Sequence, residues 1–346
     1  MTEFKRIAVD TSKHVFTLHG VDPADRVILR RDLKRAQFIG FFAALAPCEV
    51  VLEACGGSHH WGRALQALGH RVRLIPPHYV KPYVKRGKND RIDAAAIAEA
   101  ASRPGMAEVP VKSAATQAAL MQLKTRELLV GQRTQAINAL RGHAAEFGII
   151  APQGTSHVAP LLAKLAATEA IPPEGQTALA WLGAQIEQLD QQITTIDAAL
   201  LAQHKANPLS RLLAGIPGVG PLTALTLALT VDPRLFASGR HLAAWLGLTP
   251  QQNSTGGKTR LGRISKAGHV RLRTLLVIGA SAVIRHARPG SRTASPWLLG
   301  LLARKPRKVA AVALANKMAR IAWAMMTRGE AYRQPGLASP GDPVAA

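Results

Sequence analysis

The chain has 346 residues, of which 47% are hydrophobic, so it is long enough for two or three domains and too apolar for wholesale disorder. It carries 44 lysines and arginines against 21 acids, and this net charge of +23 predicts a polyanionic partner. Aromatic residues make up only 4%, which favours contact with backbone phosphates over base stacking. The alternative is a basic protein without a specific partner.

The sequence shows neither a spanning helix nor a secretory signal. No stretch approaches about 18 uncharged apolar residues, and the N-terminal residues lack the apolar core of a signal peptide. The two cysteines, Cys48 and Cys55, have no zinc-ribbon spacing and cannot form a disulfide framework. We therefore expect a cytoplasmic protein in a reducing compartment.

Residues 1–110 are predicted to form an α/β domain with a mixed sheet. The expected strands lie at residues 4–10, 14–21, 26–33, 49–54 and 72–75, where apolar residues alternate or cluster. The expected helices lie at 36–45, at 61–68 and from Asp90 through the alanine-rich segment 94–100. Pro76 and Pro77 end the last strand. Three strands followed by alternating helices and strands are typical of a mixed sheet.

Residues 111–205 predict a helical arm. A helix is expected over 113–145, and a broken connection over 152–173. Apolar residues then follow spacings of three and four for about three heptads, at Leu179, Leu182, Ile186, Leu189, Ile193, Ile196 and Leu200. This pattern predicts an antiparallel coiled-coil arm that could mediate dimerisation. An ordinary core-facing helix is the equally weighted alternative.

Residues 206–330 predict a compact, mostly helical domain of unusual charge. The segment holds 19 lysines and arginines but only two acids, Asp232 and Glu330. Such a basic rear half is suited to gripping nucleic acid. Residues 331–346 are rich in proline and glycine and predict a disordered tail. The fold class is thus α/β at the front and all-α behind.

Four acids of the front domain predict a metal site. Asp10 ends the first strand, Glu53 lies near the end of a later one, and Asp90 and Asp93 share one face at a helix start. Hard cations such as Mg²⁺ or Mn²⁺ prefer carboxylate oxygens and can assist phosphodiester chemistry. A basic loop beside Asp90 could hold a scissile strand by its phosphates, through Lys85, Arg86 and Lys88.

Each acid also has a structural interpretation. Asp90 could cap the helix, Asp93 could complement its dipole, and Asp10 could start a turn. Glu53 resists such an interpretation, because a carboxylate at an apolar strand end needs a partner or a metal. His59 and His60 lack zinc-like neighbours in sequence and are interpreted as helix-start or substrate-facing residues.

The segment 212–224 predicts two helices joined by a Pro-Gly-Val-Gly turn. Gly218 and Gly220 would let backbone amides approach a phosphate at the start of the second helix. This segment resembles the helix-hairpin-helix motif of sequence-independent DNA-binding proteins. The alternative is a plain turn between helices.

The segment 250–268 is polar, glycine-rich and free of acids and histidines. Ser254 lies there beside four cations, Lys258, Arg260, Arg263 and Lys266. A serine hydroxyl is a poor nucleophile until a base or a metal activates it, whereas the cations could neutralise a pentavalent phosphorane. From these residues alone, a phosphate-binding loop is favoured over a nucleophile. The spacing of a P-loop is absent.

Taken in order, five motifs resemble the DEDD transposases of bacterial insertion sequences, family 110, subgroup 1111. The motifs are Ile7-Ala8-Val9-Asp10, Glu53-Ala54-Cys55-Gly56-Gly57-Ser58, Lys88-Asn89-Asp90-Arg91-Ile92-Asp93-Ala94, Ile216-Pro217-Gly218-Val219-Gly220 and Asn253-Ser254-Thr255-Gly256-Gly257-Lys258. The resemblance covers about residues 4–330. One departure concerns the family's Ser-Ser-Gly loop, since the second serine is replaced by Thr255.

The resemblance implies an RNase H fold like that of the Holliday-junction resolvase RuvC at the front, with Asp10, Glu53, Asp90 and Asp93 binding metal. It implies a coiled-coil arm and a transposase domain in which Ser254 forms a covalent phosphoserine with DNA. It further implies a structured noncoding guide RNA that pairs with donor and target DNA, and a tetramer of two dimers with composite sites. Localisation at the bacterial nucleoid would follow.

Three other hypotheses compete with a metal-assisted recombinase. A structure-selective nuclease would use the acids to activate water, leaving Ser254 a bystander. A non-enzymatic architectural protein would use only the hairpin and the basic domain. A decayed element protein would be inactive, although all five candidate catalytic positions carry competent side chains.

Overall fold

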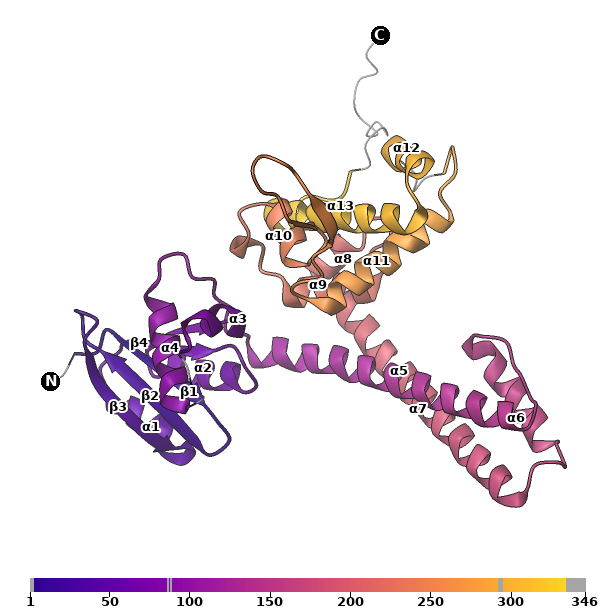
Figure 1. The fold of residues 1–346 in the computed structure, drawn as a ribbon, viewed down its shortest axis with the longest axis horizontal. Coiled ribbons are helices and arrows are strands. Elements are labelled where there is room, and N and C mark those ends of the chain that lie inside the picture. The colour runs from indigo at the N-terminus through magenta and orange to yellow at the C-terminus, as the bar shows by residue number, and fades with distance from the viewer. Residues whose placement is uncertain (1–2, 86, 88, 292–294, 334–346) are drawn as a thin grey trace, which may run out of the picture. The chain divides into compact units, whose positions relative to one another are not determined.

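The computed structural model describes residues 3–85, 87, 89–291 and 295–333 (Figure 1). The chain divides into two compact units, Met1–Ala118 and Ala119–Ala346, with the division in the first turns of α5 (Ala114–Glu146). The front unit is mixed α/β and the rear unit is mostly helical, as predicted. Arg86 and Lys88, and residues 334–346 of the predicted tail, lie outside the described residues.

The front unit is built on a five-stranded mixed sheet in the order β3-β2-β1-β4-β5. Its strands are β1 (Arg6–Thr11), β2 (Val15–Val21), β3 (Val27–Lys34), β4 (Glu49–Glu53) and β5 (Arg71–Ile75). β1, β2 and β3 pair antiparallel, whereas β4 pairs parallel with both β1 and β5. The five predicted strands are confirmed to within a few residues.

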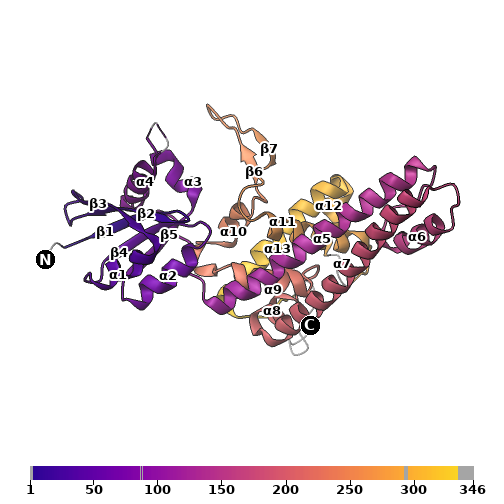
Figure 2. The same ribbon diagram turned by 90° about the horizontal axis from the view of Figure 1, so that it is seen from below.

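Helices cover both faces of this sheet (Figure 2). On one face, α1 (Phe38–Ala43) and α2 (Ser58–Ala67) pack around the edge-to-face rings of Phe16, Phe38 and Trp61. On the other, α4 (Asp90–Ser102) packs its alanines against Ala8 and Val51. Burial on both faces explains why β4 is continuously apolar at its centre.

Two short elements of this unit differ from the prediction. The helix expected at 36–45 consists of a 3-10 turn, η1 (Arg35–Gln37), followed by the shorter α1. Beyond β5, the chain forms α3 (Pro77–Val80) and η2 (Lys81–Tyr83), which were not predicted. Proline ends the strand there as expected, but it also opens α3, because its fixed φ suits a first helical turn.

The arm consists of α5 and α7 (Pro173–Ala206), with η3 (Thr155–His157) and α6 (Val158–Ala166) between them (Figure 1). Ion pairs join Arg126 to Asp197 and Arg133 to Asp190, a descending pairing that makes the long helices antiparallel. The prediction of a broken connection over 152–173 is wrong in part, because this segment contains α6.

The heptad positions of α7 are used inside the chain. Leu179 and Ile186 pack in one apolar cluster with Ile137 and Leu140 of α5, together with residues of α6. Near the other end of the arm, Leu200 packs with Leu123. The apolar seam predicted from sequence is thus buried by an intramolecular partner.

The rest of the rear unit is a helical bundle with a β-hairpin. Its helical elements are α8 (Pro208–Leu213), α9 (Pro221–Thr230), η4 (Pro233–Leu235), α10 (Gly239–Trp245), α11 (Val270–Arg285), α12 (Pro296–Arg304) and α13 (Arg307–Arg328). The hairpin strands β6 (Pro250–Gln252) and β7 (Leu261–Ile264) were not predicted.

Among the described helices, α13 alone is long and apolar enough to cross a membrane by length and composition. It carries Lys317 and Arg320, and its buried side, which includes Ala315, Met318 and Ala322, belongs to the apolar core of the rear unit.

Candidate functional site

The acids of the front unit meet at one end of the sheet. Asp10 and Glu53 follow directly after Val9 and Leu52, which are paired between the parallel strands β1 and β4. Asp90 and Asp93 lie in the first turn of α4. Ligand oxygens of Asp10, Asp90 and Asp93 all lie within 4.8 Å of one another. Residues more than 80 positions apart in sequence are thereby brought to one point.

Burial and repulsion by neighbouring carboxylates raise the proton affinity of Asp10 and Glu53. Burial, followed by the charges of Asp93, Asp90 and Glu53, raises the pKa of Asp10 to about 6. Burial, followed by the charge of Asp93, also raises the pKa of Glu53. Glu53 thus interacts electrostatically with Asp10 and Asp93, although it is not one of the three acids whose oxygens converge. Four half-buried or exposed carboxylates of this kind are a donor set that suits a hard divalent cation.

The start of α4 leaves Asp90 available. The helix is capped by Asn89, whose side-chain oxygen accepts a hydrogen bond of 3.0 Å from the Arg91 amide. The interpretation of Asp90 as a mere cap is therefore wrong. Arg91 also pairs with Asp32 at 3.3 Å, and Asp32 accepts a hydrogen bond of 2.9 Å from Thr17. These contacts tie the acidic turn of α4 to β2 and β3.

A cationic hollow that sequence reasoning missed adjoins the acids. It has a volume of about 720 Å³, and its lining includes Thr17, His19, Arg30, Lys85 and Arg91, together with the acid Glu99. Thr17 is the register partner of Asp10, so the hollow opens on the face of the sheet that carries the acids. Of the predicted basic loop, Lys85 lines this hollow. His19 of β2 lies opposite Arg30 of β3, and this pairing could not be predicted before the strand register was known.

In the rear unit, Ser254 lies near the tip of the β6–β7 hairpin (Figure 2). The tip is a tight turn in which Gly256 and Gly257 have φ of 55° and 75°, a backbone that strongly favours glycine. Thr255 and Lys258 pair across that turn. The segment predicted as a loop therefore contains a β-hairpin, in which Pro250 pairs with Ile264 and Gln252 with Leu261.

The serine stands in a cationic and exposed setting. Its hydroxyl accepts a hydrogen bond of 3.1 Å from the backbone amide of Arg260. Lys258, Arg260, Arg263 and Lys266 are exposed and form no ion pair with any other described residue. The segment contains neither acid nor histidine, so the hairpin itself offers no general base to this hydroxyl.

The two helices and the connecting turn predicted over 212–224 are present as α8, a turn over 214–220, and α9. Its glycines have different roles. Gly218, with φ of 86°, lies so close to α11 that a Cβ there would stand 2.8 Å from the Gly279 carbonyl oxygen. Gly220 caps α9 and faces open space. Packing therefore accounts for Gly218, whereas Gly220 remains accessible to a ligand.

His59 and His60 lie in the first turn of α2, as expected. The His59 ring nitrogen Nδ1 accepts a hydrogen bond of 3.2 Å from the Lys112 amide, which gives this histidine a structural role.

Comparison with known proteins places both units in one family. A family model described as "Transposase" of the DEDD type matches residues 7–148, and one described as "Transposase IS116/IS110/IS902 family" matches residues 210–295. The first therefore covers the acids and the second covers the serine hairpin.

Full-length relatives agree with these matches. The chain is 53% identical over 331 residues to "Putative transposase y4pF/y4sB" of Sinorhizobium fredii, covering 95% of this chain and 86% of the relative. It is 48% identical to "Probable family 20 transposase" of Pseudomonas aeruginosa, covering 96% and 99%. It is 43% identical to "Transposase for insertion sequence element IS1111A" of Coxiella burnetii, covering 96% and 92%.

The DEDD-type domain implies the use of divalent metal ions, and the relatives imply DNA substrates. The hypothesis of a non-enzymatic architectural protein is accordingly set aside. The chain belongs to the IS110/IS116 family of DEDD transposases of insertion sequences, enzymes that catalyse DNA cleavage and strand transfer.

Proposed function

We propose that this transposase cuts and rejoins donor and target DNA through a phosphoserine intermediate on Ser254, with Asp10, Glu53, Asp90 and Asp93 as the ligands of Mg²⁺ or Mn²⁺. The observation that carries the proposal is the convergence of three aspartate oxygens within 4.8 Å, with Glu53 coupled to them. A divalent cation held there supplies electrostatic stabilisation of the charge that develops on the phosphate.

The proposed covalent step exchanges one phosphate ester for another. The Ser254 oxygen attacks phosphorus, an ester forms between them, and the bond from phosphorus to the leaving sugar oxygen breaks. The serine gives up its proton and the sugar oxygen takes one up, so no energy source is consumed. Rejoining is the reverse reaction, in which a hydroxyl of another strand attacks the phosphoserine and releases Ser254.

The base for this step is proposed to come from the acidic cluster. The hairpin itself offers neither an acid nor a histidine, whereas the front unit offers clustered carboxylates. We propose that a site is completed when the acids of one subunit meet the serine of another. Lys258 and Arg260 would then neutralise the pentavalent phosphate.

We further propose that the front domain has an RNase H-like fold of the RuvC type. The sheet order β3-β2-β1-β4-β5, with two antiparallel pairs followed by two parallel ones, supports this assignment. The arm over 111–205, whose first residues belong to the front unit, and the transposase domain over 206–330 are proposed as separate domains.

Nucleic acid is proposed to lie along the basic surfaces of both units. The proposed contacts are Lys85, Arg86 and Lys88 at the front, and Gly218, Gly220, Lys258, Arg260, Arg263 and Lys266 at the rear. The open start of α9 at Gly220 supports a helix-hairpin-helix role. The large positive charge also supports binding of a structured guide RNA together with donor and target duplexes.

A homodimer, and a tetramer in synapsis, are proposed to form through the arm. The heptad seam is already buried within the chain, so a second copy would use other apolar side chains. Ile150 and Trp181, which are 77% and 72% exposed near the α5–α6 and α6–α7 ends of the arm, support this choice. Light scattering should show a smaller assembly for Trp181→Glu than for the matched surface variant Glu187→Gln.

The decisive experiment is an adduct assay with Mg²⁺, the element's noncoding RNA and labelled donor and target duplexes. After denaturation, wild-type protein is expected to retain covalently bound DNA. Both Ser254→Ala and Asp93→Asn should lose the adduct. Dependence on the RNA is tested in the same assay by omitting it.

One observation favours a second candidate, a structure-selective nuclease that activates water. Ser254 has no base within its hairpin, whereas the acids are already clustered. Cleavage that survives Ser254→Ala without any adduct would establish this nuclease in place of the recombinase.

A further inference from the structure

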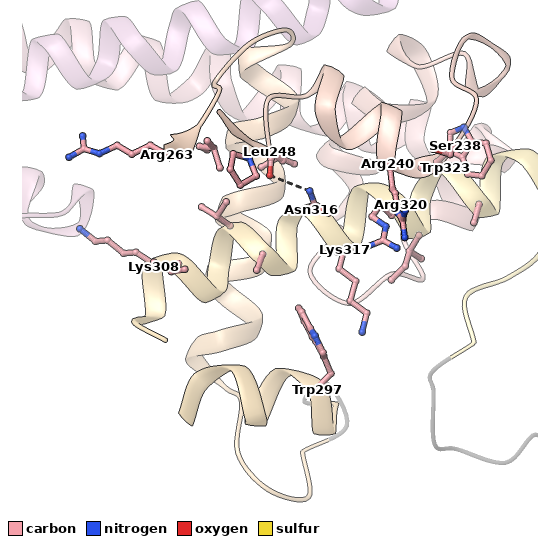
Figure 3. Close-up of a pocket in the computed structure, with 18 of the residues that line it drawn as sticks. Ser238, Arg240, Leu248, Arg263, Trp297, Lys308, Asn316, Lys317, Arg320 and Trp323 are labelled. Carbon is pink, nitrogen blue, oxygen red and sulfur yellow. Dashed lines mark hydrogen bonds between the residues drawn. The ribbon is translucent and has the colours of Figure 1, made fainter. Parts of the chain in front are cut away.

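A large groove lies in the rear unit beside the serine hairpin (Figure 3). It has a volume of about 1320 Å³ and is bounded by α10, α12, α13 and the base of the hairpin. This volume exceeds the roughly 300–1,000 Å³ of a small-ligand pocket, so an extended ligand fits it better than a compact metabolite.

The floor of the groove is apolar and aromatic. Leu248, Val312 and Ile321 contribute aliphatic surface. The Trp323 indole nitrogen donates a hydrogen bond of 3.1 Å to the Pro233 carbonyl, which anchors that ring. The Trp297 indole makes no such hydrogen bond to another described residue, and the side chain remains 41% exposed at the edge of the groove. A ring placed in this way is available for stacking.

The rim of the groove is strongly cationic. Its lining includes Arg240, Arg263, Lys308, Lys317 and Arg320, and none of the described lining residues is acidic. None of the five forms an ion pair with another described residue. The Lys317 ammonium lies 4.3 Å from the centre of the Trp297 ring, so a cation and an aromatic face stand together (Figure 3).

The groove is continuous with the strands that carry the serine. Pro250 of β6 and Gly262, Arg263 and Ile264 of β7 belong to its lining. Ser254 lies two residues beyond the end of β6. A strand whose phosphate is held at the hairpin can therefore continue into the groove.

We propose that this groove holds the single-stranded DNA next to the bond that Ser254 cuts, with an unstacked base on Trp297 and its phosphates on the cationic rim. An intact duplex hides its bases and offers only charge, whereas a single strand offers both π-faces and phosphates. The cationic rim would repel a basic peptide, whereas it matches the phosphates of a nucleic-acid strand. The assignment of the strand to DNA rests on the proposed function of Ser254, which acts on DNA.

Binding is measured by fluorescence anisotropy in EDTA, so that neither metal nor cleavage is required. The probes are a short labelled DNA strand, the same strand with its central bases removed, its duplex, and the RNA of the same sequence. Full-length wild type is expected to bind the intact strand about tenfold more tightly than the abasic one, the size typical of stacking.

Variants at the ring test the stacking contact. Trp297→Ala should lose about tenfold in affinity for the intact strand and nothing for the abasic strand, whereas Trp297→Phe should retain most of the affinity. Trp245→Ala is the matched control, because Trp245 is 38% exposed in the same unit and does not line the groove. It should bind like wild type.

Variants at the rim test the phosphate contact. Lys308→Gln should weaken both strands alike and reduce the dependence of affinity on salt by about one ion. Lys164→Gln in α6 removes the same charge away from the groove and should leave both affinities unchanged.

Three results would overturn the proposal. The first is equal binding of the intact and abasic strands. The second is a Trp297→Ala variant that binds the intact strand as wild type does. The third is tighter, Trp297-dependent binding of the RNA, which would assign the groove to RNA.

Failure of the proposed serine chemistry can be distinguished from failure of the groove proposal. Ser254→Ala should keep full binding here, so a positive result without any adduct would retain the groove and reject the nucleophile. An adduct with wild type, combined with no effect of Trp297→Ala on strand binding, would reject the groove alone.

Discussion

The candidate catalytic side chains of the front unit stand on strands and a helix that pack around a buried sheet, whereas Ser254 stands near the tip of a hairpin whose residues are almost all exposed. The acids are held together by the core beneath them, and they repel one another. The serine has the opposite setting, with cations around it and no base within the hairpin.

The two sites therefore differ in what each would require for catalysis. The acidic cluster is assembled by the fold, and a divalent cation bound there would relieve its repulsion. The hairpin contains no acid or histidine, so the proposed serine chemistry would need a base from elsewhere, for which we propose an acidic cluster. A reaction that requires both sites is then restrained until they are assembled.

The largest expected effect is a difference in adduct formation between variants at Ser254 and at Thr255. Ser254→Ala should abolish the protein–DNA adduct while leaving metal binding unchanged, because the two sites are built on different units. Thr255→Ala should reduce adduct formation less than about tenfold, since its hydroxyl is not the proposed nucleophile. Denaturing gels of labelled DNA measure both. Loss of the adduct in Thr255→Ala alone would move the nucleophile to that position.

Removal of one acid should damage catalysis without damaging the fold. For Asp93→Asn, we expect strand cleavage to fall about a thousandfold, because metal coordination contributes several kcal/mol to the barrier. The melting temperature without metal should stay the same or rise, since one repelling charge is gone. Glu3→Gln, at an exposed acid of the front unit that does not line the hollow, is the control, and it should cleave normally. Parallel losses of activity and stability in Asp93→Asn would contradict the preorganised cluster.

The acidic cluster should also make the melting temperature depend on pH and on Mg²⁺. The pKa of Asp10 is raised to about 6 from 3.8, so the folded protein binds this proton more tightly than the unfolded chain. Its contribution to stability is present below pH 3.8 and is lost as the pH rises through 6. A divalent cation should offset that loss, so Mg²⁺ should raise the melting temperature above about pH 6 and progressively less below it.

Asp10→Asn serves as the control for this titration. Its melting temperature should respond to Mg²⁺ much less, at every pH. A Mg²⁺ response of the wild-type protein that did not weaken on acidification would count against carboxylate ligands.

The smallest expected effect comes from an ion pair within the arm. Asp197→Asn removes the partner of Arg126 across α5 and α7. It should cost about 0.5–1 kcal/mol of unfolding free energy, as a partly exposed ion pair does, and should leave cleavage unchanged. Urea unfolding measures the cost. A large loss of cleavage would indicate that the arm positions the active sites, which is the role proposed for it in assembly.

Much of the fold followed from local pattern. The strands of the front sheet, the helices α4, α5 and α7, and the basic rear half were predicted because alternation, helical periodicity and charge are properties of neighbouring residues. The β6–β7 hairpin was missed because its strands are exposed on both faces and carry no apolar alternation. Its Gly256-Gly257 turn was the available signal.

By itself, the sequence determined the chemical inventory: four acids at strand ends and a helix start, a serine among cations, and a heptad of apolar residues. Tertiary structure alone decided how these are used. The strand register and the packing of α4 bring three aspartates to one point. The heptad seam faces α5 rather than solvent, and Trp297 meets Lys317 above an apolar groove. These contacts depend on packing between segments far apart in the chain, and no local sequence pattern encodes such packing.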